Sequence, residues 1–319
     1  MNLPRRTLGT SELDVSIMSL GSWRTFEHIS RDDGVDVMRA ARDAGINFLD
    51  DARYDDETGT APIPTGYSEV VFGELFRAAC WERDEVVVAN KLWWEHWPHE
   101  DAAAELDGSL GRMGFDHVDL IYAIRPPDQL PISAVVEQVG GLVASGRARA
   151  WGTGMWTAAQ HHEALRVCAE IGVAPPCAAQ MANSLVDHAG PDEPAMRQAF
   201  DAGPISLIAS YVLAGGTLTG KYLSTGTGGR ASSDDSPLMA RGKAVAAQVV
   251  ALASEWNVPA NHVAFAYAFG HPHLGSIVFG ARSADHVRSN AAAHATYAAL
   301  DDGQRAQIHS LGGNSIEPI

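Results

Sequence analysis

Three side chains with the chemistry for proton transfer follow two apolar runs of this sequence. Asp50 follows the run 46–49, Tyr54 comes four residues later, and Lys91 follows the run 86–89. A lysine ammonium beside a phenol favours the phenolate and lowers the pKa of the tyrosine, and a carboxylate beside the lysine keeps it charged and oriented. Such a phenol can protonate a carbonyl oxygen as hydride arrives, or accept the proton in reverse. The same residues are also compatible with a structural ion pair near an unrelated surface tyrosine.

The elements that must position these side chains alternate along the chain. Short apolar runs, each typical of a buried strand, occur at 17–20, 46–49, 86–89, 118–122, 148–151, 178–181, 205–209 and 276–279. Amphipathic helical patterns lie between them at 32–44, 69–79, 100–113, 132–145, 158–171 and 196–202. Strands that alternate with helices predict a parallel sheet. Eight such units favour a closed barrel over an open doubly wound sheet, and no G-x-G-x-x-G follows the first run, which ends at Leu20-Gly21-Ser22-Trp23.

We therefore predict an α/β protein with the (β/α)₈ TIM-barrel fold, as one domain over residues 1–319. The carboxyl ends of all barrel strands meet at one face, so the three side chains can converge there. Gly45, Gly114 and Gly146 follow helical patterns and suit the left-handed position after a helix. The segment up to Ser16 is predicted to form a hairpin that closes the barrel floor. Two long loops, 51–68 and 223–238, leave carboxyl ends of strands, and the second is either a surface loop or a cover for a cofactor.

Charge and cysteine content exclude several classes of function. The formal net charge of −16 disfavours nucleic-acid binding and attraction to an anionic membrane. Three widely spaced cysteines, Cys80, Cys168 and Cys177, match no zinc motif and no disulfide framework, so we expect buried thiols in a reducing compartment. No apolar segment follows Arg5 and Arg6, and no run is long enough to span a membrane. We expect a cytoplasmic protein with a small-molecule substrate, and its oligomeric state stays open.

Several motifs together resemble those of the aldo-keto reductases. They are Asn47-Phe48-Leu49-Asp50 with Ala52 and Tyr54, Val87-Val88-Ala89-Asn90-Lys91, the segment 109–120, Leu218-Thr219-Gly220-Lys221-Tyr222 and Gly280-Ala281-Arg282-Ser283. They occur in the family's order from about Leu8 to Asn290 and so cover most of the chain. The resemblance implies a (β/α)₈ fold, an NADP(H) cofactor, with NAD(H) as the other choice, and reversible reduction of a carbonyl.

The resemblance also assigns site residues. Asp50, Tyr54 and Lys91 would be three members of the catalytic tetrad. Tyr54 is one residue closer to Asp50 than is usual in the family, so Tyr67 is the alternative proton donor. The cofactor-binding positions would be Gly21, Trp23, Gln180, Ser210, Tyr211, Leu213, Gly216, Leu218, Gly280, Arg282, Ser283 and Asn290. Arg282 would pair with phosphate, and the helix that starts near Ser283 would present its N-terminus to it.

Three departures from the family pattern fall at the nicotinamide end. Ile124 takes the place of the tetrad histidine and cannot donate a hydrogen bond to a substrate oxygen. Gly154 and Met155 replace the Ser-Asn pair that holds the nicotinamide carboxamide, and Ser210 replaces the stacking aromatic, with Tyr211 one place later. Two interpretations stay open. The chain is a divergent reductase, or it is a non-redox lyase or isomerase, or a dinucleotide-binding regulatory protein, on the same barrel.

Residues after the predicted strands bear on the substrate and on the missing histidine. The tryptophans at or just beyond strand ends are Trp23, Trp93, Trp94, Trp97 and Trp156. Together they predict a broad apolar pocket, suited to a bulky aromatic, polyketide-like or glycosidic substrate, although some could simply pack the loops. His96 is a candidate replacement for the missing histidine. His96 and His99 lack a third metal ligand, so no metal site is predicted.

Overall fold

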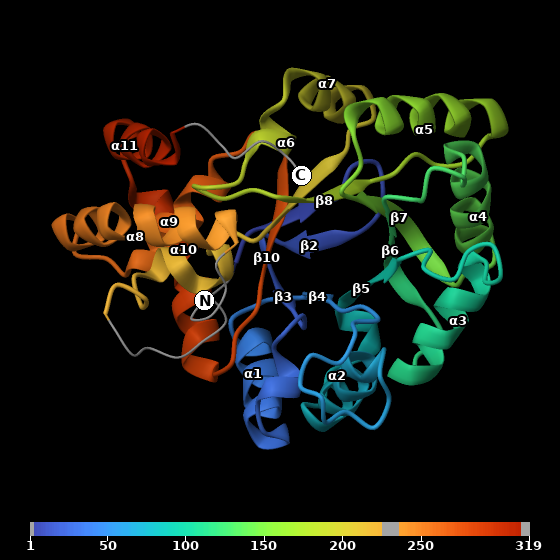
Figure 1. The fold of residues 1–319 in the computed structure, drawn as a ribbon, viewed down its shortest axis with the longest axis horizontal. Helices are drawn as coiled ribbons and strands as arrows, with labels where there is room; N and C mark the ends of the chain where they lie inside the picture. The colour runs from blue at the N-terminus through green and yellow to red at the C-terminus, as the bar shows by residue number, and fades with distance from the viewer. Residues whose placement is uncertain (1–2, 225–235, 314–319) are drawn as a thin grey trace.

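A closed barrel of eight parallel strands forms the centre of the computed structural model, which describes residues 3–224 and 236–313 (Figure 1). The strands are β3 (Met18–Gly21), β4 (Phe48–Asp50), β5 (Val87–Leu92), β6 (Val118–Ile124), β7 (Ala148–Gly154), β8 (Ala178–Ala182), β9 (Ser206–Ser210) and β10 (Leu274–Phe279). They follow one another around the barrel in chain order, and β10 closes it by pairing with β3. The predicted fold class is confirmed.

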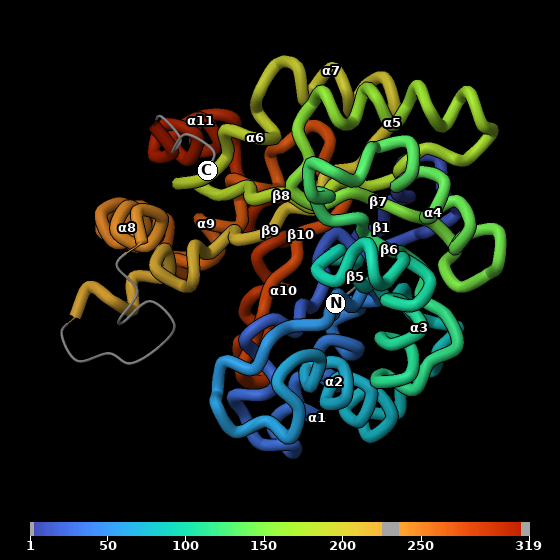
Figure 2. The backbone as a smooth tube through the Cα atoms, turned by 45° about the vertical axis from the view of Figure 1, so that its right-hand side comes forward, coloured from blue at the N-terminus to red at the C-terminus, as the bar shows by residue number. Residues whose placement is uncertain are grey.

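Helices surround the barrel. They are α1 (Arg31–Asp43), α2 (Tyr67–Ala78), α3 (Ala102–Met113), α4 (Ile132–Ala144), α5 (Ala158–Ile171), α6 (Ala189–Asp192), α7 (Pro194–Ala202), α8 (Pro237–Glu255), α9 (Ala260–Phe269), α10 (Ala284–Ala299) and α11 (Asp302–Gly312). Short 3₁₀ helices are η1 (Phe26–His28), η2 (Arg83–Glu85) and η3 (Ala214–Thr219). In both views, α8 to α11 gather on one side of the barrel and α3 to α5 on the other (Figures 1 and 2). None of the described helices is long and apolar enough to cross a membrane.

The floor of the barrel is closed by an antiparallel hairpin, as predicted. Its strands are β1 (Arg5–Thr7) and β2 (Asp14–Ser16). Leu8, Leu13 and Val15 are at most 2% exposed and pack with the barrel-interior side chains of Phe48 and Tyr122. Because this apolar plug fills the floor, polar chemistry inside the barrel is restricted to the opposite end, where the strands finish.

The strand ends are where the sequence prediction was least accurate. The apolar runs were expected to stop at Ala89, Tyr122 and Trp151, yet β5, β6 and β7 continue to Leu92, Ile124 and Gly154. These extra residues include Lys91 and small side chains, which an apolar pattern does not mark as strand. The longer β5 carries Lys91 on the barrel wall, whereas Tyr54 lies in the loop that follows β4.

Turns and loops follow the prediction where they are described. Gly45, Gly114 and Gly146 have φ values of +85°, +72° and +77°, the left-handed conformation expected after a helix. The loop 51–68 closes on itself through a bridge between Asp55 and Thr65. Most of the loop predicted over 223–238 lies outside the described residues.

Candidate active site

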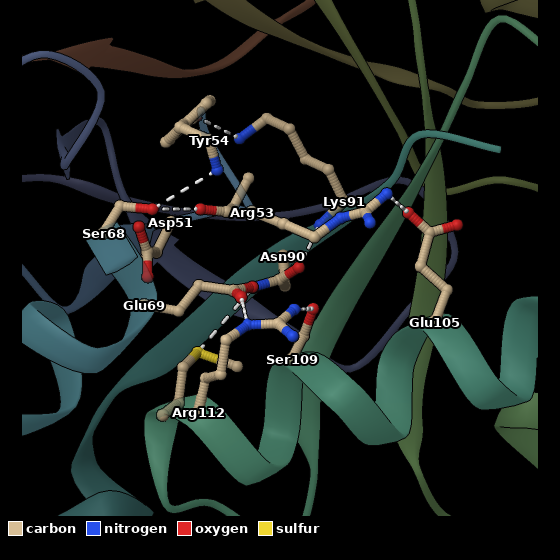
Figure 3. Close-up of polar contacts among 12 residues, drawn as sticks. Asp51, Arg53, Tyr54, Ser68, Glu69, Asn90, Lys91, Glu105, Ser109 and Arg112 are labelled. Carbon is tan, nitrogen blue, oxygen red and sulfur yellow. Dashed lines mark hydrogen bonds and ion pairs between the residues drawn. The ribbon is translucent and has the colours of Figure 1, made fainter. Parts of the chain in front are cut away.

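Lys91 joins the two other predicted catalytic residues at the mouth of the barrel. Its ammonium Nζ donates to Asp50 Oδ1 at 2.5 Å and to the Tyr54 hydroxyl at 3.2 Å. Strands β4 and β5 pair in parallel, so Asp50 and Lys91 finish side by side, and both side chains are at most 5% exposed. Figure 3 shows the lysine chain extended toward Tyr54. The structure therefore brings a carboxylate, an ammonium and a phenol into direct contact.

The phenol next to Lys91 belongs to Tyr54 and not to Tyr67. Tyr67 begins α2, where its hydroxyl accepts a hydrogen bond of 3.1 Å from the Arg31 guanidinium. The backbone of Tyr54 is held by Ser68, in the first turn of α2. Ser68 Oγ donates to the Ala52 carbonyl at 2.8 Å and accepts from the Tyr54 N–H at 3.3 Å (Figure 3). Helix α2 thus holds the shortened Asp50–Tyr54 segment in place.

The pKa of Tyr54 is raised well above its ordinary value, so the expectation of a lowered pKa is wrong. Burial of the phenol is the largest cause, followed by the negative charges of Asp50, Asp51 and Glu27. The Asp50 carboxylate, which also binds Lys91, places negative charge beside the phenol and opposes its ionisation. Tyr54 is therefore a protonated hydrogen-bond donor at neutral pH.

Aromatic rings border Tyr54 on two sides. The Trp93 ring meets it edge-on with 6.1 Å between centroids, and the Trp23 ring lies 6.4 Å away. Trp23 in turn contacts Tyr211 at 5.4 Å. Tyr211 is 40% exposed and has a left-handed φ of +55°, which turns its backbone sharply after β9. These rings give the mouth an apolar border next to the proton donor.

Two of the five predicted pocket tryptophans are buried inside the protein instead, and a third is partly buried. Trp94 is 4% exposed, and its indole N–H donates to the Ile124 carbonyl at 2.9 Å. Trp156 is 2% exposed and packs against Trp151. Trp97 is partly buried against the outer core. Spacing alone cannot tell these from Trp23 and Trp93, because a tryptophan beyond a strand end can turn either way.

Ile124 lies where the resemblance places a histidine, and it closes the site with an apolar side chain. It is 6% exposed and belongs to the cluster that fills the barrel, with Trp93 packed against that cluster. A Cβ on Gly154 would come within 2.4 Å of Ile124 Cδ1. Met155 is 58% exposed. His96 is exposed, and its ring makes no hydrogen bond or ion pair with any described residue, so nothing in the structure supports it as a replacement.

Two predicted cofactor positions adjoin Asp50. Gln180, on β8, donates from Nε2 to Asp50 Oδ2 at 2.8 Å. Gly21, at the end of β3, stands beside Asp50 in the sheet, and a Cβ there would come within 2.9 Å of Val278. Ser210 ends β9, where its carbonyl accepts from the Asn183 N–H at 3.1 Å. Gly21 and Ser210 therefore lie at strand ends, and Gln180 lies within β8, where it reaches Asp50.

The predicted phosphate-binding residues gather where β10 gives way to α10. Ser283 caps α10 by accepting from the His286 N–H at 3.2 Å. The Arg282 guanidinium donates to the Arg24 carbonyl at 3.1 Å. A Cβ on Gly280 would come within 2.7 Å of Thr25 Oγ1, so a side chain cannot fit between these loops. Arg282, the capping residue Ser283 and the N-terminus of α10 therefore lie together after β10.

The remaining predicted cofactor residues divide between the η3 turn and the protein interior. Gly216 has a φ of +88°, and a Cβ there would come within 3.1 Å of the Lys221 side chain. Leu213 is partly buried, and Leu218 is completely buried among core residues. Asn290 is 5% exposed, and its Oδ1 accepts from Asn261 at 2.9 Å. The side chains of Leu218 and Asn290 thus serve the packing of η3 and α10.

A buried polar network behind the site was not found from the sequence. Asp51 is fully buried and accepts from Ser22 Oγ. Glu69, also fully buried, accepts from Asn90 at 2.8 Å and from Arg112 at 2.6 Å (Figure 3). Burial, followed by the nearby charge of Glu69, raises the pKa of Asp51 well above its ordinary value. The consecutive aspartates after a buried run are the only sequence signal, and they do not name the partners.

A second network ties Arg53 to Glu105 on α3. The Arg53 guanidinium donates to Glu105 at 3.0 Å and to the exposed Glu95 at 3.1 Å. Both Arg53 and Glu105 were missed, because each looks like an ordinary charged residue of a loop or helix. Among the residues that the structure describes, no group of His, Cys, Asp and Glu is placed to hold a metal ion.

Comparison with known proteins agrees with this arrangement. Residues 17–312 match the Aldo/keto reductase family. A probable voltage-gated potassium channel subunit beta from Oryza sativa subsp. japonica is 28% identical, and the match covers 89% of each chain. A protein of the same description from Arabidopsis thaliana is 26% identical, again over 89% of each chain, and a putative one from Schizosaccharomyces pombe is 27% identical over 91% of this chain and 87% of its own. Since the family match spans nearly the whole barrel, this chain belongs to the aldo/keto reductase family.

Proposed function

We propose that the protein is an NADP(H)-dependent reductase that interconverts a carbonyl and an alcohol on a bulky, aromatic small molecule. NAD(P)H-dependent oxidoreduction is the chemistry that the family implies. The observation that carries the proposal is the position of Lys91 Nζ, which bridges Asp50 at 2.5 Å and the Tyr54 hydroxyl at 3.2 Å. A proton donor held this way at a barrel mouth suits carbonyl reduction.

The residues present fit a dinucleotide. Gly280 packs so closely on Thr25 that no side chain fits there, and α10 begins four residues later, directly after its cap Ser283. A helix of this length directs unpaired N–H groups and a partial positive charge at an anion. Arg282 stands beside it and would bind phosphate as a forked donor, which favours NADP(H) over NAD(H). Gln180 and Tyr211 would contact the nicotinamide end.

The reaction follows from the contacts of Tyr54. A reduced nicotinamide supplies hydride to the carbonyl carbon when it is bound. Tyr54 donates its hydroxyl proton to the carbonyl oxygen as negative charge develops there, and Lys91 stabilises the resulting phenolate across 3.2 Å. Asp50 holds the Lys91 side chain in position through its hydrogen bond to Nζ. Ile124 offers no second donor to the substrate oxygen.

The substrate class rests on the border of the mouth. Trp23, Trp93 and Tyr211 present ring surface beside Tyr54, and Met155 adds an exposed thioether. Rings at these separations favour an aromatic partner that can stack or meet them edge-on. A small aldehyde would leave most of this surface in water. We therefore propose an aromatic ketone or aldehyde in place of a simple aliphatic one.

The test is turnover with matched tyrosine variants. Wild-type protein is mixed with NADPH or NADH and a panel of aromatic and aliphatic carbonyls, and loss of nicotinamide absorbance is followed. Tyr54→Phe should lower kcat by roughly 10²- to 10⁴-fold. Tyr67→Phe removes a hydroxyl of the same type that contacts Arg31, and it should leave kcat unchanged. Equal loss in both variants, or full activity of Tyr54→Phe, would exclude the assignment.

A second candidate function is dinucleotide-dependent regulation of a partner with little turnover. It is favoured by one observation, the replacement of a histidine by buried Ile124 next to Gly154, which removes polar groups from the nicotinamide end. Because some relatives are described as potassium channel beta subunits, a channel is a partner to test. Tight NADPH binding without oxidation by any carbonyl of the panel would support this candidate over the reductase.

A further inference from the structure

Glu105 connects the two loops that build the site. Its Oε1 accepts from Arg53 at 3.0 Å and from the Trp93 N–H at 2.8 Å, and its Oε2 accepts from the Trp94 N–H at 3.2 Å. Arg53 directly precedes Tyr54, whereas Trp93 directly follows β5, the strand that carries Lys91. Figure 3 shows the Arg53 guanidinium reaching Glu105 on α3. One carboxylate thus holds the segment of the proton donor and the segment of its aromatic neighbour.

The rings at the ends of these segments touch. Trp93 meets Tyr54 edge-on, with 6.1 Å between centroids and 64° between ring planes. The backbone between Trp93 and Trp94 turns sharply, because Trp94 has a left-handed φ of +63°. Such a turn costs energy in a bulky residue and persists only where surrounding contacts enforce it. The Glu105 carboxylate and the Ile124 carbonyl, which accepts from the Trp94 indole, supply those contacts.

The burial of the Arg53 and Glu105 side chains indicates that this pair does more than stabilise the fold. Their side chains are 6% and 4% exposed. Removing two charges from water costs several kcal/mol for each ion, and a buried pair often adds little net stability over apolar residues of the same size. Glu95, the other partner of Arg53, is 51% exposed and is screened by solvent. The buried contact is therefore the one that fixes the position of Arg53.

We propose that Arg53 and Glu105 form a positioning pair that holds the Tyr54 phenol and the Trp93 indole in their edge-on contact at the mouth of the barrel. Neither residue touches the reacting atoms. The kinetic part of this inference rests on the proposed reductase function. The geometric part, the coupling between the two rings, does not.

The experiment uses a variant without an uncompensated buried charge. Arg53→Met/Glu105→Gln removes both charges, keeps the length of the Glu105 side chain and retains the unbranched first part of the Arg53 side chain. Glu95→Gln, which removes the exposed partner of the same arginine, and Asp107→Asn, which removes an exposed α3 carboxylate paired with Arg147, are the controls. Should the double variant not fold, Glu105→Asp keeps the charge and withdraws the carboxylate by one methylene. Arg53→Lys keeps a cation beside Glu105 and tests rescue.

Two readouts separate the inference from the proposed function. In protein labelled with fluorotryptophan, the Trp93 resonance should shift on Tyr54→Phe, because the rings are in contact. That response should be lost in Arg53→Met/Glu105→Gln or Glu105→Asp and kept in both controls and in Arg53→Lys. In turnover, kcat should fall about tenfold or more with little change in the dissociation constant for NADPH, since misplacing a reacting group mainly affects the chemical step.

Each result bears on one statement. An intact Trp93 response together with unchanged kcat in the charge-free variant, or in Glu105→Asp, would overturn the positioning role. If the wild-type protein never oxidises NADPH but the Trp93 response is lost in the charge-free variant and kept in the controls, the reductase is refuted and the positioning pair stands. A kcat loss in Glu95→Gln as large as that in the buried pair would also overturn it, because general electrostatics would then explain the effect.

Discussion

The side-chain amide of Gln180 donates a hydrogen bond of 2.8 Å to Oδ2 of Asp50, the carboxylate whose other oxygen binds Lys91 at 2.5 Å. Asp50 is therefore held by a side chain from β8, Gln180, as well as by Lys91 from β5. An amide proposed to contact the nicotinamide therefore already has one of its two N–H donors committed to Asp50, which leaves the second N–H and the carbonyl oxygen for a ligand.

Replacing Gln180 by methionine should therefore affect catalysis more than binding. A hydrogen bond to a charged group contributes roughly 1.5–3 kcal/mol, so the loss of this contact should lower kcat about tenfold to a hundredfold. The dissociation constant for NADPH, measured by fluorescence titration, should change much less. A variant with normal kcat and weak NADPH binding would contradict this and make Gln180 a cofactor ligand first.

The raised pKa of Tyr54 predicts the pH dependence of both directions. The phenol stays protonated through the ordinary pH range. Tyr54 should therefore cause no decline in the rate of carbonyl reduction as the pH rises to about 10. Alcohol oxidation needs the phenolate, so its rate should rise steadily with pH over the same range. Profiles of kcat/KM in the two directions check this. A fall in reduction centred near neutral pH, absent from Tyr54→Phe, would contradict it.

The sequence predicted the barrel because the barrel depends on a repeated pattern. All eight apolar runs overlap the observed strands, and the six helical patterns overlap α1 to α5 and α7. Burial of one face at the right period is a local property, so it is readable without the structure. The position of Tyr54 beside Lys91 follows from the same pattern, because parallel strands must end at the same face.

What could not be predicted depends on contacts between distant segments. The pairing of Arg53 with Glu105 joins residues 52 positions apart, and either residue alone looks like a solvated charge. The pKa of Tyr54 was predicted with the wrong sign because the burial of the phenol and the negative charges around it depend on the folded structure. Whether Trp93 or Trp94 faces the mouth depends on one left-handed backbone angle.

Asp51 should reduce stability at neutral pH. Its pKa is raised in the folded protein, so between about pH 4 and that raised value the folded state binds more protons than the unfolded state. The free energy of unfolding should then fall as pH rises, by up to about 1.4 kcal/mol for each pH unit in that window. Asp51→Asn keeps an acceptor for Ser22 and should remove this dependence while stabilising the protein at pH 7.

Urea unfolding at several pH values measures the Asp51 effect. Asp55→Asn, in an exposed position of the same loop, is the control and should leave the pH dependence unchanged. If Asp51→Asn destabilised the protein at pH 7 and kept the original pH dependence, the buried carboxyl would be a favourable contact, and its proton would not be the cause of the slope.

Ile124 and Gly154 should behave as one coupled substitution. The Cδ1 atom of Ile124 occupies the space that a side chain at position 154 would need, 2.4 Å from an added Cβ. Gly154→Ala should therefore cost about 1–3 kcal/mol of stability through overpacking. Ile124→Val removes the clashing methyl group and alone should cost about 0.5–1.5 kcal/mol. The double variant should be more stable than the sum of the two changes predicts.

Denaturation of the four proteins gives the coupling energy, with Gly141→Ala as control, since a Cβ in that part of α4 meets nothing within 4 Å and should stabilise the helix. Additive single effects would show that the barrel wall relaxes around residue 154 without Ile124. A large coupling would mean that the family's histidine and serine positions changed together here, because the isoleucine requires the glycine. A side chain with a hydroxyl group at position 154 would then be tolerated only after Ile124 is shortened. Polar groups can be restored at the nicotinamide end only in this order of substitutions.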